Sequence, residues 1–273
     1  MKFTELLYPP KCPSCGELLP FGGFFGSNVE NQSALCPECL PLWEREKEEE
    51  CGACGEMVIN CQCATKMMQS AGCKVFRKLV YYRPGNRNEI GNRVAYRIKD
   101  HADRHAVNFL AEELAPGIRE SMSAAEWSEK SFFLVYLPRR SGIVLKNGND
   151  QAKELALSLA KQLNLPLIPA IGRRAKNRTP QKFLGSAKRL SNAKGAFYFL
   201  EKYKSEIAGK VAILIDDIVT SGASMTAGIR VLRRAGAKGF LAVAVASDEC
   251  NRNPPVVTPE TKSELDYFSY RRY

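Results

Sequence analysis

The feature that most constrains the fold is the stretch 211–225, which reads Val-Ala-Ile-Leu-Ile-Asp-Asp-Ile-Val-Thr-Ser-Gly-Ala-Ser-Met. Its first five residues are apolar and rich in β-branched side chains, which predicts a short buried parallel strand. The residues after the small-residue turn predict a helix with Ser224 as its N-cap and Gly236 just past its end. A turn at a helix N-terminus offers unpaired N–H groups and a positive dipole end to a phosphate. Asp216 and Asp217 beside it suit a ligand that also carries hydroxyls or a metal, so the stretch predicts a site for a phosphorylated ribose.

This stretch resembles the phosphoribosyl pyrophosphate (PRPP) motif of the type I phosphoribosyltransferases. The resemblance implies that Asp216 and Asp217 contact the ribose hydroxyls, that Mg²⁺ accompanies PRPP, and that the following loop wraps the 5′-phosphate. The residues of that loop are Thr220, Ser221, Gly222, Ala223 and Ser224. The alternative is an ordinary strand-to-helix turn in which the two aspartates cap backbone groups.

Cysteine spacing defines the first part of the chain, since eight of the ten cysteines form four close pairs. The pairs are Cys12 and Cys15, Cys36 and Cys39, Cys51 and Cys54, and Cys61 and Cys63. Two residues between paired cysteines place both thiolates at one edge of a tetrahedron, so two pairs close a structural zinc site. We expect two zinc ions, one held by the first two pairs and one by the last two. Cys73 is an alternative ligand of the second site, and a redox dithiol is the alternative for any single pair.

Length and composition bound the class of protein. The chain has 273 residues, 45% of them hydrophobic, which is enough for a full α/β core and a small extra module. No apolar run has the length of a membrane span, and residues 1–10 lack the apolar segment of a signal peptide. We therefore expect a cytoplasmic protein, in which cysteines bind metal rather than form disulfides.

The order of elements predicts an α/β fold, a type I phosphoribosyltransferase-like parallel sheet flanked by helices and preceded by a small zinc-knuckle module. The expected elements are a helix within 41–50, strand 75–82, helix 86–114 ended by Pro116, strand 131–137, helix 151–163, strand 167–171, helix 225–235 and strand 239–246. In the first helix, Leu42 and Trp43 are expected to pack inward. The expected domains are a cysteine-rich module over 1–70, the phosphoribosyltransferase-like domain over 71–250, and a tail over 251–273.

Two groups of cations are candidates for contacts with phosphate. In a doubly wound sheet, ligands bind beyond the carboxyl ends of the strands, so the loop with Arg139 and Arg140 is expected to face the acidic loop and to hold pyrophosphate. Residues 172–194 form the most basic stretch and contain no acid, so the net charge of +11 is concentrated there rather than spread evenly. The candidates there for a nucleic-acid backbone are Arg173, Arg174, Lys176, Arg178 and Lys182. Pyrophosphate neutralisation and plain solvated loops are the alternatives.

The whole order of modules resembles the ComF/ComFC competence family. The resemblance rests on residues 7–16, Leu-Tyr-Pro-Pro-Lys-Cys-Pro-Ser-Cys-Gly, on Pro138-Arg139-Arg140, on Arg178-Thr179-Pro180-Gln181, and on 211–225. It implies the handling of transforming single-stranded DNA, with a DNA-uptake helicase or processing protein as partner. The chain departs from relatives in having Asn147-Gly148-Asn149-Asp150-Gln151 for their Arg-Gly-Phe-Asn-Gln. An active phosphoribosyltransferase with an unidentified acceptor is the alternative function.

Overall fold

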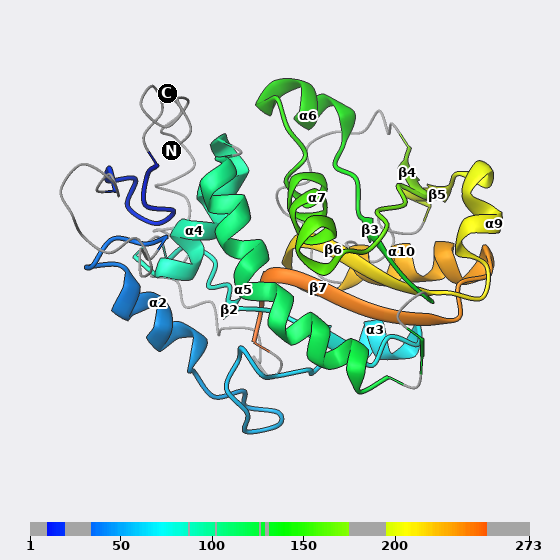
Figure 1. Ribbon diagram of the computed structural model, residues 1–273, viewed down its shortest axis with the longest axis horizontal. Helices are drawn as coiled ribbons and strands as arrows, with labels where there is room; N and C mark the ends of the chain where they lie inside the picture. The colour runs from blue at the N-terminus through cyan, green and yellow to red at the C-terminus, as the bar shows by residue number, and fades with distance from the viewer. Residues whose placement is uncertain are drawn as a thin grey trace, which may run out of the picture.

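A parallel sheet forms the centre of the protein. The computed structural model describes residues 10–19, 34–86, 88–101, 103–125, 127–128, 131–174 and 195–249. The strands of the sheet are β1 (Val75–Arg77), β2 (Val80–Tyr81), β3 (Phe132–Tyr136), β6 (Val211–Val219) and β7 (Gly239–Ser247). Their spatial order is β1-β7-β6-β3, and β2 pairs with the far end of β7 (Figure 1). Because β6 and β7 have neighbours on both sides, their sequences are continuous apolar runs rather than alternating ones.

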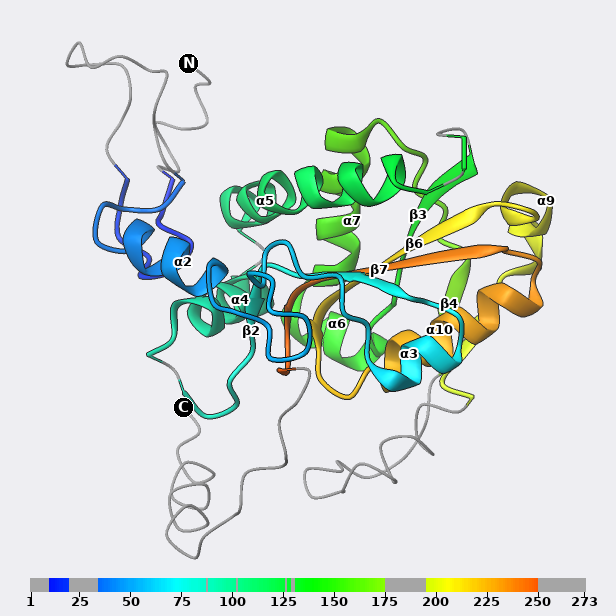
Figure 2. The same cartoon turned by 90° about the horizontal axis from the view of Figure 1, so that it is seen from below.

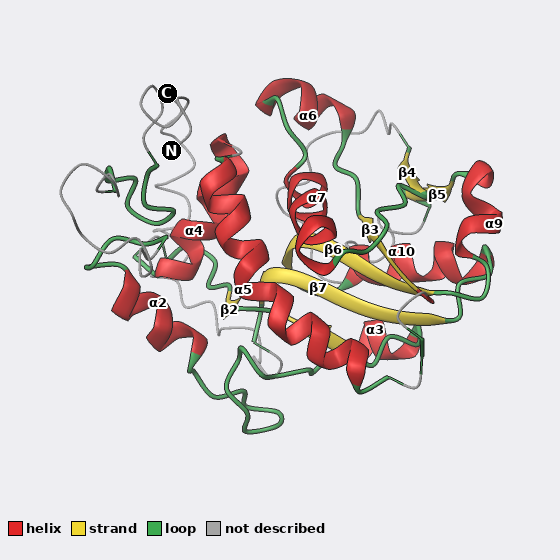
Figure 3. Cartoon of the chain, in the orientation of Figure 1, coloured by secondary structure: helices red, strands yellow, loops and turns green. Residues whose placement is uncertain are grey.

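Helices cover both faces of this sheet, as Figures 2 and 3 show. Alternate residues of β6 point to opposite faces, so Ile213 and Ile215 lie in one buried cluster and Ala212 and Leu214 in the other. The first face is covered by α4 (Ile90–His101), α5 (Arg104–Ser123) and α7 (Gln151–Leu163). The second face is covered by α3 (Lys66–Ser70) and α10 (Ala223–Arg234). The expected parallel sheet between helices is therefore confirmed.

The remaining elements lie around this core. They are α2 (Leu40–Lys47), α6 (Ser141–Asn147), β4 (Ile171–Arg173), β5 (Phe197–Phe199), the 3₁₀ helix η3 (Glu201–Tyr203) and α9 (Lys204–Ile207). Strands β4 and β5 form an antiparallel pair apart from the main sheet. Within the described ranges, no helix combines the length and the apolar character needed to cross a membrane.

The cysteine-rich segment packs onto the helical face through α2. Trp43 is fully buried, its ring centre lies 5.5 Å from that of Phe109 in α5 with the two rings tilted, and its indole N–H donates to Glu113 at 3.0 Å. Glu46 accepts hydrogen bonds from the backbone N–H groups of Ile90 and Gly91 at 2.8 Å, where α4 begins. The carboxylate thus satisfies N–H groups that a helix start leaves unpaired. The first cysteines therefore share one buried cluster with α4 and α5.

Several sequence-based expectations for helix boundaries are wrong. Helix α5 does not stop before Pro116 but contains it, because the apolar face continues to the buried Ile118 and Met122 and outweighs one lost backbone bond. Leu42 is exposed, because the buried face of α2 is the one that carries Trp43 and Glu46. The N-cap of α10 is Gly222 rather than Ser224.

The predicted C-terminal end of α10 is confirmed, whereas the strand predicted near residue 167 is not. Gly236 has a φ of 106° and the predicted left-handed conformation, and the backbone N–H of Ala237 bonds to the carbonyl of Leu232 at 3.1 Å. The strand expected over 167–171 is wrong, because Leu167 makes only one parallel bridge to Leu134. The hairpin strand β4 begins later, at Ile171, because its pairing partner is β5.

Candidate ligand crevice and metal centres

The turn from β6 to α10 has the geometry of an anion site. Strand β6 continues through Asp216 and Asp217 to Val219, further than the sequence predicted, because β7 pairs with it as far as Ser247. Gly222 then adopts a left-handed conformation with a φ of 75°, and its carbonyl accepts the first helical bond from Thr226 at 2.8 Å. The N–H groups of the first turn of α10 have no helical acceptors and lie at the positive end of its dipole. This end of the sheet can therefore bind a phosphate.

The two aspartates lie side by side at the carboxyl end of β6. Each carboxylate accepts the backbone N–H of the next residue, at 2.9 Å for Asp216 and 2.8 Å for Asp217. Burial, and then the neighbouring charge of Asp217, raise the pKa of Asp216 well above the usual aspartate value. Asp216 can therefore take up a proton at a higher pH than an exposed aspartate.

Arg139 joins this end of β6 to the loop after β3. Its guanidinium forms an ion pair with Asp217, and its backbone N–H donates to Asp150 at 2.9 Å. Leu137 extends the pairing of β3 by donating to the carbonyl of Ile215 at 3.0 Å, which brings the two loops to the same edge. The expected meeting of the two loops is confirmed. Arg140 is exposed at the start of α6.

Arg173, which the sequence suggested as a nucleic-acid contact, lies against the same loop after β3. Its guanidinium donates to the Pro138 carbonyl at 3.1 Å and lies 5.0 Å from the ring centre of Phe197. Burial, followed by the charge of Arg140, lowers its pKa. The neighbouring Arg174 lies over the ring of Tyr198 at 5.8 Å. Lys176, Arg178 and Lys182 lie outside the described residues.

Asp150 is a site residue that the sequence reasoning did not identify. Its side chain is 8% exposed, and one carboxylate oxygen accepts from Arg139 while the other has no hydrogen-bond partner among the described residues. It precedes α7 at the N-cap position but makes no side-chain cap. In the sequence, Asp150 directly precedes a predicted helix. That position indicates an N-cap and gives no sign of a contact with another loop.

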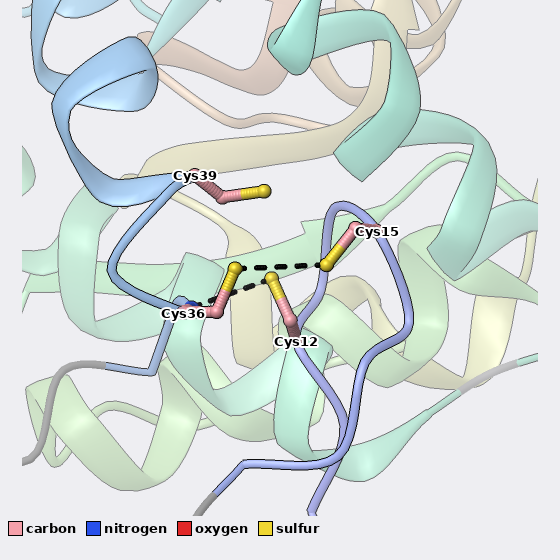
Figure 4. Close-up of side chains that lie close together, drawn as sticks. All are labelled: Cys12, Cys15, Cys36 and Cys39. Atoms are coloured by element: carbon pink, nitrogen blue, oxygen red, sulfur yellow. Dashed lines mark hydrogen bonds between the residues drawn. The ribbon is translucent and has the colours of Figure 1, made fainter.

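The first cysteine cluster brings together Cys12, Cys15, Cys36 and Cys39, whose sulfurs all lie within 4.8 Å of one another (Figure 4). A tight turn with Gly16 at a φ of 81° closes the first pair, and the second pair lies where α2 begins. Burial raises the pKa of Cys12, but hydrogen bonds from the backbone of Cys36 and Cys15 outweigh it and lower the pKa to about 7. Such donors favour the thiolate form that a metal needs.

The second cluster brings together Cys51, Cys54, Cys61 and Cys63, again within 4.8 Å. The Sγ of Cys61 accepts from the backbone N–H of Cys63 at 3.4 Å and from the ammonium of Lys78 at 3.0 Å. Cys73 lies apart from this cluster and donates its thiol to the Val75 carbonyl at 3.3 Å. It is fully buried and packs as a small apolar residue. Both groups of four sulfurs match the donor set of a structural zinc site and can hold zinc.

Comparisons with known proteins agree with this arrangement. Residues 149–264 match the family described as phosphoribosyl transferase domain. Competence protein F from Haemophilus influenzae is 31% identical over 91 residues, which cover 33% of this chain and 39% of that protein. The match thus spans less than half of the relative's length. The crystal structure of TT1426 from Thermus thermophilus is 20% identical over 54% of this chain and 75% of that chain, with a TM-score of 0.29.

The parallel sheet flanked by helices fits a type I phosphoribosyltransferase fold, in agreement with the family match over residues 149–264. Two clusters of four cysteines precede it in the chain. This order, two cysteine clusters that can hold zinc followed by a phosphoribosyltransferase-like domain, is a ComF-like architecture.

Proposed function

We propose that this protein binds a ribose-phosphate ligand of the PRPP type and acts with single-stranded DNA in DNA uptake during natural transformation. The observation that supports ligand binding is the convergence of an anion-type helix start, two aspartates and three arginines at one edge of the sheet. The competence relative supports the role in transformation.

In this proposal, each group in the crevice has a separate task. The N–H groups at the start of α10 and the hydroxyls of Thr220, Ser221 and Ser224 hold the 5′-phosphate. Asp216 and Asp217 accept hydrogen bonds from the ribose hydroxyls and can share a Mg²⁺ ion with the ligand, since Mg²⁺ prefers carboxylate and phosphate oxygens. Arg139 and Arg140 bind the pyrophosphate.

Ligand binding then requires a change of partners at Asp217. Its carboxylate is paired with Arg139 in this structure, so it is only partly available to a sugar hydroxyl. A pyrophosphate would draw the guanidinium of Arg139 toward itself and release the carboxylate of Asp217. Arg173 at the end of β4, whose guanidinium is held by the Pro138 carbonyl, stays beside this loop and keeps its surroundings positive.

The DNA part of the proposal assigns backbone contacts to the basic segment after β4. Arg174, Lys176, Arg178 and Lys182 supply positive charge without a nearby acid in the sequence. The proposed location is the cytoplasm, and the proposed protein partner is a DNA-uptake helicase or processing protein.

Thermal unfolding with PRPP tests the ligand site. A ligand that binds only the folded state adds RT ln(1 + [L]/Kd) to the free energy of unfolding, which is about 2.7 kcal/mol at a hundredfold excess over Kd. We expect a magnesium-dependent rise in melting temperature that is lost in the variant Asp216→Asn with Asp217→Asn. The exposed pair Glu201→Gln with Glu206→Gln is the matched control and should keep the full rise. A full rise in the aspartate variant would contradict the assignment.

A second candidate function is phosphoribosyl transfer to an unidentified acceptor. The pKa of Asp216, which burial raises well above the usual aspartate value, favours it, because a carboxylate with a raised pKa is a better general base than an ordinary one. The test is pyrophosphate release from PRPP with a panel of nitrogen nucleophiles. Pyrophosphate release that requires an acceptor and is lost in Asp216→Asn would support phosphoribosyl transfer. PRPP binding without pyrophosphate release would support a binding role alone.

A further inference from the structure

A short segment connects the second cysteine cluster to the phosphate loop. Two residues after Cys63, Thr65 caps helix α3 by accepting the backbone N–H of Met68 at 3.3 Å. Helix α3 packs beside α10, which begins at the phosphate loop (Figure 2). The metal-binding segment is thus part of the wall around the proposed ligand site.

The contact between α3 and the loop is centred on Gly222. A Cβ atom built on Gly222 would lie 2.4 Å from Thr65 Oγ1 and 3.2 Å from Met68 Sδ. Met68 is fully buried, so its side chain is fixed against the loop. Because Gly222 holds the left-handed conformation from which α10 starts, this packing fixes the direction of the N–H groups that face the phosphate.

Helix α3 depends on its flanking segments for its position. It has five residues, and an isolated helix of that length is not stable in water. At its far end, Cys73 donates its backbone N–H to the Met68 carbonyl at 3.0 Å, and the chain continues into β1 of the sheet. At its near end, the segment pairs with β1 through an isolated bridge between Cys63 and Val75. The backbone N–H of Phe76 also donates to the Gln62 carbonyl at 3.0 Å, and zinc held by Cys61 and Cys63 would add a further anchor on this side.

The first cluster has different surroundings. Gly16 of its turn packs against the guanidinium of Arg97 in α4, and Cys39 lies at the start of α2. Its buried cysteines lie in the hydrophobic core formed with α4 and α5, whereas Met68 lies in the hydrophobic core on the other face of the sheet, with α10. The two metal sites can therefore be compared within one chain.

We propose that zinc in the second cluster, acting through Thr65 and Met68, positions the phosphate loop and so sets the affinity for a phosphate-bearing ligand, while zinc in the first cluster does not. The affinity part rests on the proposed function, but the effect on the loop can be measured without any ligand. Thr65 and Met68 are positioning residues here, since they act through Gly222.

The size of the effect follows from how often the loop holds its binding conformation. If loss of this zinc leaves the loop correctly placed for about a tenth of the time, the apparent Kd rises about tenfold. Hydrogen exchange of the amides in 218–226 should quicken as well, because exchange reports the same opening.

The experiment compares two single-ligand variants of the full chain. Cys54→Ser and Cys15→Ser each replace an exposed cysteine of one cluster. Elemental analysis should give one zinc per chain for each variant, against two for the unmodified protein. In the absence of ligand, hydrogen exchange of 218–226 should quicken in Cys54→Ser and stay unchanged in Cys15→Ser. Equal exchange in both variants would overturn the proposal.

The ligand measurement is a separate arm. Calorimetric titration with ribose 5-phosphate should give a Kd about tenfold higher for Cys54→Ser than for Cys15→Ser. If the unmodified protein does not bind this probe, the proposed function fails, but the exchange result still decides the coupling. If it binds and both variants keep its affinity, the coupling fails alone.

A second pair of variants covers the case in which Cys54→Ser unfolds the segment. Met68→Ala removes the contribution of Met68 to the packing on Gly222 and keeps all eight cluster cysteines. Met67→Ala is its control, because Met67 is only partly buried. We expect two zinc ions in both variants and faster exchange of 218–226 only in Met68→Ala. Unchanged exchange in Met68→Ala would contradict transmission through this side chain.

Discussion

The ammonium of Lys78 donates a hydrogen bond to Sγ of Cys61 at 3.0 Å, although the Lys78 residue is only 1% exposed. A buried ammonium is costly unless an opposite charge accompanies it. Four thiolates with one Zn²⁺ carry a net charge of −2, so the second cluster supplies that charge when zinc is bound. Lys78 also lines a cleft of about 320 Å³ that extends along α5 to Glu113.

This contact predicts that Lys78 tightens zinc binding in the second cluster only. Replacing Lys78 by Met removes the charge and keeps most of the side-chain volume. Loss of a group that hydrogen-bonds a metal ligand typically lowers metal affinity by about 10- to 100-fold. Zinc transfer to a coloured chelator should therefore become faster for one of the two ions. The exposed Lys74→Met is the control, and identical release from both variants would argue against a role for the ammonium.

Glu46 predicts a pH dependence of stability. Burial, together with the nearby Glu89, raises its pKa to about 7 against the bonds from Gly91 and Ile90. Because the folded protein keeps this proton to a higher pH than the unfolded chain, the contribution of Glu46 to stability falls as pH rises from about 4.5 to about 7. The loss is on the order of 3 kcal/mol, at 1.36 kcal/mol per pKa unit.

Glu46→Gln resembles the protonated form at every pH. Urea unfolding between pH 5 and 8 should therefore show a smaller decline of the unfolding free energy for Glu46→Gln than for the unmodified protein. The exposed Glu48→Gln controls for the loss of one charge. Parallel curves for Glu46→Gln and the unmodified protein would show that Glu46 does not titrate in this range.

We predict that Gly222→Ala destabilises the protein more than Gly148→Ala, although the two glycines have the same backbone conformation. Gly222 and Gly148 have φ values of 75° and 76°, but a Cβ on Gly148 would have no atom within 4 Å. Left-handed backbone costs an alanine about 1–2 kcal/mol at either position. At Gly222 the overlap with Thr65 adds a steric cost of about 1–3 kcal/mol. Urea unfolding of both variants measures the difference. Equal losses of unfolding free energy would show that α3 moves aside without cost.

The salt dependence of DNA binding tests the basic segment. Arg173 is held at the Pro138 carbonyl, so the variant replaces four other cations by Gln, namely Arg174, Lys176, Arg178 and Lys182. For single-stranded DNA, the slope of log affinity against log salt changes by about 0.7 per phosphate contact, so it should flatten by roughly two to three units. Filter binding at several salt concentrations measures it.

The control for this experiment removes the same charge elsewhere. It replaces four exposed cations of the α3 and α10 side by Gln, namely Lys66, Arg230, Arg234 and Lys238. Its slope should stay near that of the unmodified protein. An equal flattening in both variants would mean that net charge alone attracts DNA, and an unchanged slope in the first would remove the segment from the interface.

The sequence by itself predicted what depends on near neighbours along the chain. The spacing of Cys12 with Cys15, and of Cys51 with Cys54, fixes pairs of sulfurs through the reach of a single turn, so both clusters were predictable. The apolar run of β6 predicted a buried parallel strand, and the small residues after it predicted the turn into α10.

Only the tertiary structure decided which distant residues meet. Arg77 and Lys78 interrupt an apolar strand pattern, but nothing local indicates that Lys78 reaches Cys61 or that Arg77 bonds Ser121 at 2.7 Å. Likewise, the packing of Thr65 on Gly222 joins segments that are far apart in the sequence. Such contacts are chosen by how whole elements bury their apolar faces, and a local pattern carries no information about the partner that a face will find.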